Sequence, residues 1–215
     1  VPVIAVTGRP AGWAEPFARD GPVAAVVVEN GGATWVRDGD GVRLEFADDE
    51  GVRLARAPRL RACLAGIRRE VPGADAARDS AGRRTDIAVD HAEFAHLDAA
   101  QVDAVVAVMR RHGLHVSVSS IHVNGWLGDH DKWSGACRAV ERVLGVPLDP
   151  ARWVYVGDSA NDEAVFARVP LSVGVANIAR WWPRLASPPA FVTRGERGAG
   201  FAEVARALLA QRASC

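Results

Sequence analysis

At 215 residues, the chain is long enough to bury one large core or two small ones. The hydrophobic share of 49% and the charged share of 24% are typical of a globular protein that folds in water. Because 26 basic residues balance 26 acidic ones, the net charge is zero, which argues against an electrostatic nucleic-acid binder. No apolar run approaches the ~20 residues that span a bilayer, so we expect neither a nucleic acid nor a membrane as partner.

The cysteine and lysine usage is uneven. Cys63, Cys137 and Cys215 are odd in number and lack C-x-x-C spacing, so they indicate neither a disulfide framework nor a zinc site and favour a cytoplasmic protein. Of the 26 basic residues, 25 are Arg, and Lys132 is the one Lys. Lys is a compact point charge that the planar fork of Arg does not replace. Composition alone leaves function and chance as alternatives for Lys132.

The first part of the chain reads as two strands around a helix. Residues 1–6 (VPVIAV) predict a buried strand, which Thr7-Gly8-Arg9-Pro10 ends. Residues 13–19 have helical spacing, and residues 23–28 (VAAVVV) predict a second short strand. Glu29-Asn30-Gly31-Gly32 then supplies turn residues.

The middle of the chain mixes strands and helices without strict alternation. We predict short strands at 34–36, 42–46, 52–55, 85–90 and 114–123, the last with a break near 119–120, and helices at 58–71 and 98–112. Asp98 is placed to cap the second helix, whose apolar stripe includes Val105 and Met109. This mixed order of strands and helices indicates a separate α+β module.

From Asp131 onward, strands and helices alternate again. We predict helices at 132–144, after 162 through 168, at 178–185 and at 199–211, and strands at 153–156, 171–175 and 190–192. Such alternation favours a doubly wound, Rossmann-like parallel sheet. The predicted organisation is therefore α/β, with core parts at 1–32 and 121–215 and an inserted α+β module at 33–120.

Two polar turns follow strands of the predicted parallel sheet, where ligands bind in such folds. One is Thr7-Gly8-Arg9, with a hydroxyl and backbone N–H groups suited to a phosphate oxygen. The other is residues 157–162 (GDSAND), which places Asp158, Asn161 and Asp162 on one strand-to-helix turn. Carboxylate and amide oxygens of this kind suit Mg²⁺ with a substrate phosphate. The alternative is a simple turn at 7–10 and a helix cap at 158–159.

The order of these motifs resembles the haloacid dehalogenase (HAD) phosphatase superfamily. The inserted module and residues 173–177 (VGVAN) make the chain most similar to its IIB, or Cof-type, branch, which carries an α+β cap and includes sugar-phosphate and mannosyl-3-phosphoglycerate phosphatases. The resemblance implies that Thr7, with Gly8, binds the transferring phosphoryl group and that Lys132 neutralises its charge. It further implies that Asp158 ligates Mg²⁺, with Asn161 and Asp162 in support.

The chain departs from the family pattern at its first motif. That motif is D-x-D on a strand before Thr-Gly-Arg, and it supplies the nucleophile and the acid/base. Residues 38–41 (DGDG) fit a hairpin turn better, and 129–131 (DHD) precede the lysine instead. We therefore expect the first core strand, and with it the nucleophile, to lie upstream of residue 1, and the chain as given to be inactive.

Further residues are candidates for contact with substrate, each with a structural alternative. They are Arg9, Glu29, Asn30, Arg84, Asp86, His122 and Asn124. Glu29-Asn30 is alternatively a plain turn, Arg84, Asp86 and Asp90 the solvent face of a strand, and His122 a structural histidine. The expected function is Mg²⁺-dependent hydrolysis of a small phosphomonoester through an aspartyl-phosphate, with a sugar phosphate or phosphoglycerate derivative as substrate. The rivals are a non-catalytic sugar-phosphate-binding module and a phosphomutase.

Overall fold

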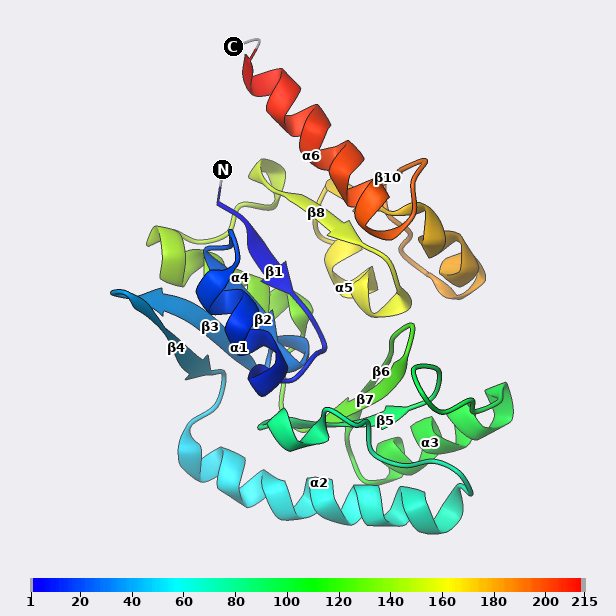
Figure 1. The fold of residues 1–215 in the computed structure, drawn as a ribbon. Helices are drawn as coiled ribbons and strands as arrows, with labels where there is room; N and C mark the ends of the chain where they lie inside the picture. Colours follow the sequence, from blue (N-terminus) through cyan, green and yellow to red (C-terminus); the bar gives the residue numbers. More distant parts are fainter. Residues whose placement is uncertain (1, 214–215) are drawn as a thin grey trace. The chain divides into compact units, whose positions relative to one another are not determined.

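The computed structural model describes residues 2–213 and divides after Leu148 into two compact units (Figure 1). The first unit runs in the order β1 (Ile4–Val6), α1 (Ala11–Asp20), β2 (Ala25–Val28), η1 (Glu29–Gly31), β3 (Ala33–Asp38), β4 (Gly41–Phe46), α2 (Glu50–Glu70), η2 (Ser80–Gly82), β5 (Asp86–Asp90), α3 (Ala99–Arg111), β6 (His115–Val118), β7 (His122–Trp126) and α4 (Lys132–Leu144). Here η denotes a 3₁₀ helix.

One sheet of the first unit has the strand order β1-β2-β3-β4. β1 and β2 are parallel, whereas β2, β3 and β4 pair antiparallel. Alternate residues of β2 face opposite layers: Val26 and Val28 pack with α1, and Ala25 and Val27 pack with α4. Figure 1 shows these two helices on either side of the strands. Both faces of β2 are thus buried, as expected for a parallel core strand.

The second sheet of this unit has the order β5-β7-β6 and is fully antiparallel. Helices α2 and α3 supply its core, in which Ile67, Met109 and Val123 are completely buried. α3 begins at a capping box between Asp98 and Gln101, as the sequence predicts for Asp98. We call residues 47–127 the cap module, since they leave the first sheet after β4 and return at α4.

The second unit contains η3 (Pro150–Arg152), β8 (Val154–Gly157), η4 (Ala160–Asp162), α5 (Glu163–Phe166), β9 (Leu171–Gly174), η5 (Ala176–Arg184), β10 (Phe191–Val192) and α6 (Arg197–Ala213). Its three strands are parallel, in the order β10-β9-β8. The predicted α/β class, with parallel core strands and an α+β module, is confirmed.

In each unit, an apolar parallel strand lies at one edge of a sheet and is paired on one side only. Within residues 2–213, β1 pairs with β2 and β8 pairs with β9, and neither has a second strand partner. All residues of β1 and β8 are only partly buried, while β2 is fully buried. An unpaired strand edge exposes backbone donors and acceptors that a further strand can satisfy.

The module boundaries differ from the predicted positions 33 and 120. β3 and β4 extend the first sheet by pairing with β2, so residues 33–46 belong to the core. β7 pairs with β5 and β6, so residues 122–126 belong to the cap module. Residues 52–55, predicted as a strand, lie in α2, which Asp49 caps by accepting a hydrogen bond from Val52 N. Residues 39–40 form the tight β3–β4 turn, as predicted for the DGDG sequence.

No helix in the described part of the chain is long and apolar enough to cross a membrane. Cys63 is buried in α2, Cys137 lies within α4, and Cys215 falls outside the described residues.

Candidate functional site

The Thr7 loop continues directly from β1. Thr7 N donates to Val27 O at 2.9 Å, which extends the pairing with β2. Arg9 N donates to Thr7 Oγ1 at 3.1 Å and so fixes the direction of the hydroxyl oxygen. Because that oxygen already accepts a hydrogen bond, the hydroxyl proton is left to donate to another acceptor. A Cβ on Gly8 would lie 3.0 Å from Asn30 Oδ1, so a larger residue would crowd this loop.

Glu29 and Asn30 form a strained turn behind the Thr7 loop. Both adopt positive φ, 50° and 55°, which non-glycine residues seldom do without strong contacts to hold them. The buried Glu29 carboxylate accepts hydrogen bonds from Ala11 N, from Arg84 N, and from the N and Oγ1 of Thr85. It therefore joins the start of α1 to the cap module, and this structural role accounts for its contacts.

Asn30 combines a backbone role with an unsatisfied side chain. Its N–H donates to Thr7 O at 3.2 Å. Its side chain is buried beside Gly8, and neither its Oδ1 nor its Nδ2 has a hydrogen-bond partner. A buried amide of this kind is costly unless some polar group meets it, which keeps Asn30 a candidate for ligand contact.

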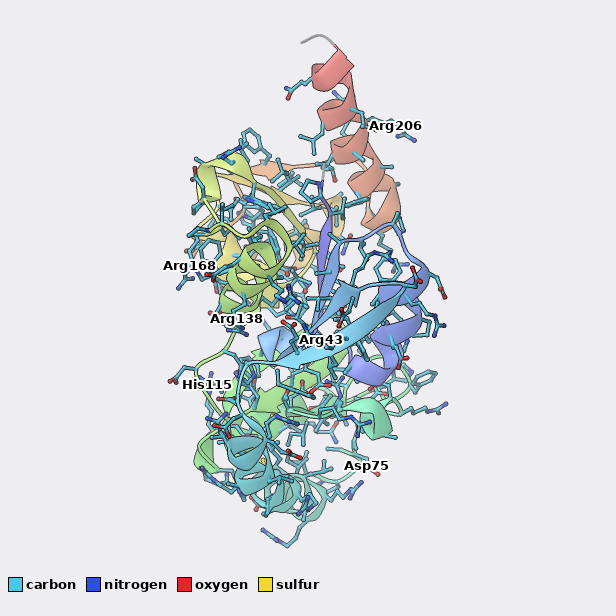
Figure 2. The ribbon with its side chains drawn as sticks, turned by 90° about the vertical axis from the view of Figure 1, so that its left-hand side faces the viewer. Arg43, Asp75, His115, Arg138, Arg168 and Arg206 are labelled. Atoms are coloured by element: carbon cyan, nitrogen blue, oxygen red, sulfur yellow. The ribbon has the colours of Figure 1, made fainter. Side chains whose placement is uncertain are left out.

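Lys132 is the first residue of α4, and a capping box between Asp131 and Ser134 fixes that helix start. α4 approaches η1 closely: a Cβ on Gly31, whose φ is +102°, would lie 2.0 Å from Asp131 O. Arg138, labelled in Figure 2, also donates to Gly31 O. Since η1 is bonded to the Thr7 loop, Lys132 starts its helix at the same edge of the sheet as Thr7. Its side chain is buried at a helix N-terminus, where the helix dipole disfavours a cation.

Arg9 and His122 meet at one carboxylate of the cap module. The guanidinium of Arg9 bonds to Asp79 at 3.0 Å and to Glu93 at 2.6 Å. His122 Nε2 lies 2.9 Å from Glu93 Oε2, and burial lowers the pKa of this histidine. Asp90 anchors the turn that carries Glu93, because its carboxylate accepts four backbone N–H groups from residues 92–95.

Asp86 forms a buried ion pair in the cap module. Arg83 Nη1 lies 2.8 and 2.9 Å from its two carboxylate oxygens, and Asn124 Nδ2 donates to it at 3.3 Å. Burial raises the pKa of Asp86 to about 6, against the opposing influence of Arg83. The solvent-face alternative for Asp86 and Asp90 is therefore wrong, because both are buried. Arg84 alone exposes its side chain, while its N–H binds Glu29.

In the second unit, Asp162 organises the loop that follows β8. Its Oδ2 accepts from Asp158 N at 2.9 Å and from Ser159 N at 3.1 Å, and its Oδ1 accepts from Tyr155 at 2.6 Å. Desolvation and the Asp162 carboxylate raise the pKa of Tyr155 well above its ordinary value, so the phenol stays a donor. Asn161 Oδ1 accepts from Ser159 Oγ at 2.7 Å. Asp162 and Asn161 thus shape the loop and leave Asp158 at its start.

Asn177, from the VGVAN segment, holds the Asp158 carboxylate. Its Nδ2 donates to Asp158 Oδ2 at 3.2 Å, and its Oδ1 accepts from Arg197 N at 3.0 Å, where α6 begins. In the described residues no group of three His, Cys, Asp or Glu side chains is placed to hold a metal ion. One oriented carboxylate still fits Mg²⁺, which commonly takes one or two carboxylates together with water and substrate phosphate. The chain's own residues therefore fit part of a magnesium site, centred on Asp158.

Sequence reasoning missed Asp79, Arg83, Glu93 and Asn177. Arg83 and Asp86 stand three positions apart, a spacing at which opposite charges can pair, and this was the available signal. Asn177 lies in a segment that the resemblance already identified. Nothing local to Asp79 or Glu93 indicates their contact with Arg9, since 70 and 84 residues separate the partners.

The fold is that of HAD-superfamily phosphatases, as the resemblance predicts. A Thermoplasma acidophilum protein is 17% identical, with a TM-score of 0.69 over 95% of this chain and 81% of that one. The sucrose-phosphatase from Synechocystis, solved with sucrose and phosphate, is 14% identical, with a TM-score of 0.66 over 94% and 82%. A HAD subclass IIB sugar phosphatase is 11% identical, with a TM-score of 0.62 over 97% and 85%. No family model matches the chain, and no curated protein matches it significantly.

Proposed function

We propose that this chain carries most of the active site of a Mg²⁺-dependent phosphomonoester hydrolase. The observation that carries the proposal is the Thr7 loop, whose hydroxyl is oriented by Arg9 N and whose sheet edge also receives the start of the Lys132 helix. Phosphoryl transfer relies largely on positioning and charge stabilisation, which a hydroxyl, backbone N–H groups and a lysine can supply. The shared fold with solved phosphatases supports the same reaction class.

The roles follow from the chemistry of each group. Thr7 and Gly8 bind phosphoryl oxygens, Lys132 neutralises their charge, and Asn30 can contribute its unsatisfied amide. Asp158 holds Mg²⁺, which when bound stabilises negative charge on the transferring group. Asp162 and Asn161 maintain the loop that presents Asp158. The Asp158 orientation depends on Asn177, which occupies one carboxylate oxygen.

The nucleophile is proposed to be an aspartate on a further parallel strand that pairs with the open edge of β1. Support comes from the one-sided pairing of β1 within residues 2–213, and from the polar Thr7 loop that follows this strand. The aspartate would attack phosphorus, release the alcohol and form an aspartyl-phosphate, which water then hydrolyses. The 215-residue chain by itself is then expected to bind phosphate without turning over a phosphoester.

The substrate is proposed to be a small phosphorylated sugar or glycerate derivative in the cytoplasm. The cap module brings polar groups to the Thr7 loop, with Glu93 and Asp79 on Arg9 and His122 beside Glu93. Such groups suit hydroxyl or carboxylate recognition near a bound phosphate. Closure of a cap would also exclude bulk water.

Hydrolysis of p-nitrophenyl phosphate by a protein that includes the proposed nucleophile strand tests this function. We expect Mg²⁺-dependent turnover, and a loss on the order of 100-fold or more in kcat for Lys132→Ala or Asp158→Ala, because each removes charge stabilisation of the transition state. Arg142→Ala is the matched control, an exposed cation on the same helix as Lys132 that pairs with Glu45. Unchanged turnover in both site variants would contradict the assignment. A phosphorylated isomer formed without free phosphate would instead indicate a mutase.

A further inference from the structure

Arg83 connects the cap module to the Thr7 loop through one backbone atom. It lies between η2 and β5, and its side chain is 3% exposed. Its Nη1 donates to Gly8 O at 3.0 Å, and the same nitrogen contacts both oxygens of Asp86. Its Nη2 lies 3.4 Å from Asp79 Oδ1. The guanidinium therefore reaches a main-chain carbonyl inside the Thr-Gly-Arg motif.

The Gly8 carbonyl and the Arg9 N–H belong to one peptide unit. No peptide bond in the described part of the chain is cis, so this carbonyl and this N–H point in opposite directions. With Arg83 holding Gly8 O on one side, Arg9 N is directed to the other side, where it donates to Thr7 Oγ1 at 3.1 Å. The rotation of this peptide thus sets the direction of the hydroxyl proposed to bind phosphate.

Arg83 is itself held firmly. Asp86 is completely buried at its side chain, and Asn124 donates to it from the neighbouring strand β7. Asp79 also pairs with Arg9, so the Asp79 carboxylate contacts both Arg83 and Arg9. A buried ion pair can often be replaced by apolar residues without loss of stability. The contact with Gly8 O is therefore separable from the ion pair by experiment.

We propose that Arg83 is a positioning residue that fixes the phosphate-binding loop through Gly8 O, so that the cap module contributes to phosphate affinity without touching the phosphate. This rests on the proposed function, in which Thr7 binds the phosphoryl group. The state of the cap module is thereby coupled to the Thr7 hydroxyl, and a displaced cap weakens phosphate binding.

Calorimetric titration of the 215-residue chain with inorganic phosphate tests the proposal, with urea unfolding in parallel. Arg83→Met should weaken phosphate binding about tenfold, the effect of one lost positioning hydrogen bond, and should also destabilise the fold by leaving the buried Asp86 without its cation. The double variant Arg83→Met/Asp86→Leu should recover stability while phosphate binding stays weak. Arg78→Met, an exposed arginine of the same segment, should change neither property.

Amide exchange supplies a readout that a merely structural role would not move. In the double variant, Arg9 N–H should exchange faster with solvent, because its peptide is no longer held through Gly8 O. Recovery of both stability and phosphate affinity in the double variant would overturn the proposal. Phosphate binding that Thr7→Val abolishes but Arg83→Met leaves unchanged would overturn it while sparing the proposed function. Absence of phosphate binding in the wild-type chain would instead reject the proposed function, and this inference with it.

Discussion

At the scale of single residues, Glu29 gives the clearest case of a carboxylate used for structure. Its oxygens accept from Ala11 N, Arg84 N and both donors of Thr85, and it is fully buried at a positive φ. Hydrogen bonds to a charged acceptor are about twice as strong as neutral ones. The ordered start of α1 and the attachment of residues 84–85 both depend on this one side chain.

Glu29→Gln should therefore lower the free energy of unfolding by about 2–4 kcal/mol, since the amide places an NH₂ group against donors that need an acceptor. Urea unfolding measures the change. Glu141→Gln on the exposed surface of α4 is the control and should stay within about 0.5 kcal/mol of the wild type. Equal stability of Glu29→Gln and wild type would show that the carboxylate charge is not needed there.

The sequence predicted the places of the candidate residues along the strands and helices better than it predicted their burial. Thr7, Lys132 and Asp158 stand at the strand or helix ends where the pattern placed them. Glu29, for which the sequence alternative is a plain turn, proved to be buried by partners that include Thr85, 56 residues away. Burial of this kind arises from tertiary contacts, and no local pattern of charge or periodicity reports it.

At the scale of elements, helix α2 shows how a local signal can mislead. The alternation of Arg with apolar residues predicts a helix over residues 58–71, and residues 52–55 are predicted as a strand. The structure begins α2 at Glu50, with Asp49 as the cap, so Pro58 lies inside the helix. A proline there has no N–H for the carbonyl of Leu54, and its ring crowds that carbonyl.

Pro58→Ala should stabilise the first unit by about 1–2 kcal/mol. The gain of a helical hydrogen bond and of helix propensity, up to ~3 kcal/mol, is reduced by the greater freedom of the unfolded chain. Urea unfolding of this variant and of Pro22→Ala, an exposed loop position of the same unit, gives the comparison. A destabilised Pro58→Ala would mean that Pro58 is itself required for packing of α2 on the cap sheet.

At the scale of the whole molecule, the sequence predicted a core sheet and an α+β module, but not which strands belong to each. The alternating pattern of residues 33–46 is compatible with pairing to β2 and also with pairing inside the cap module. The pattern of β7 is likewise compatible with either sheet. Periodicity sets which face of a strand is buried, whereas the identity of its neighbour depends on long-range packing. The predicted boundaries at 33 and 120 shifted for this reason.

His130 lies in the segment that returns from the cap module to α4, and its burial makes the stability of this unit depend on pH. The histidine stacks on Trp126 at 5.9 Å, as does His115, labelled in Figure 2, at 6.0 Å. Both its ring nitrogens are buried without a hydrogen-bond partner. Burial lowers its pKa to about 4, Arg138, Arg56 and His115 act in the same direction, and Asp48 opposes them. The folded chain therefore holds this ring neutral.

Because the folded pKa lies below the ordinary value of 6.5, the unfolded chain takes up the proton first, and stability falls as pH drops from about 6.5 towards 4. The contribution has a slope of at most about 1.4 kcal/mol per pH unit. Asp86, with its raised pKa, increases stability as pH falls over part of this range. The test therefore compares wild type with a variant that lacks only His130, so that the contribution of Asp86 cancels. The stability of wild type minus that of His130→Leu, from urea unfolding at pH 7, 6 and 5, should decrease as pH falls. A difference that stays constant across these values would mean that His130 titrates alike in the folded and unfolded chain, and that its burial does not persist in solution.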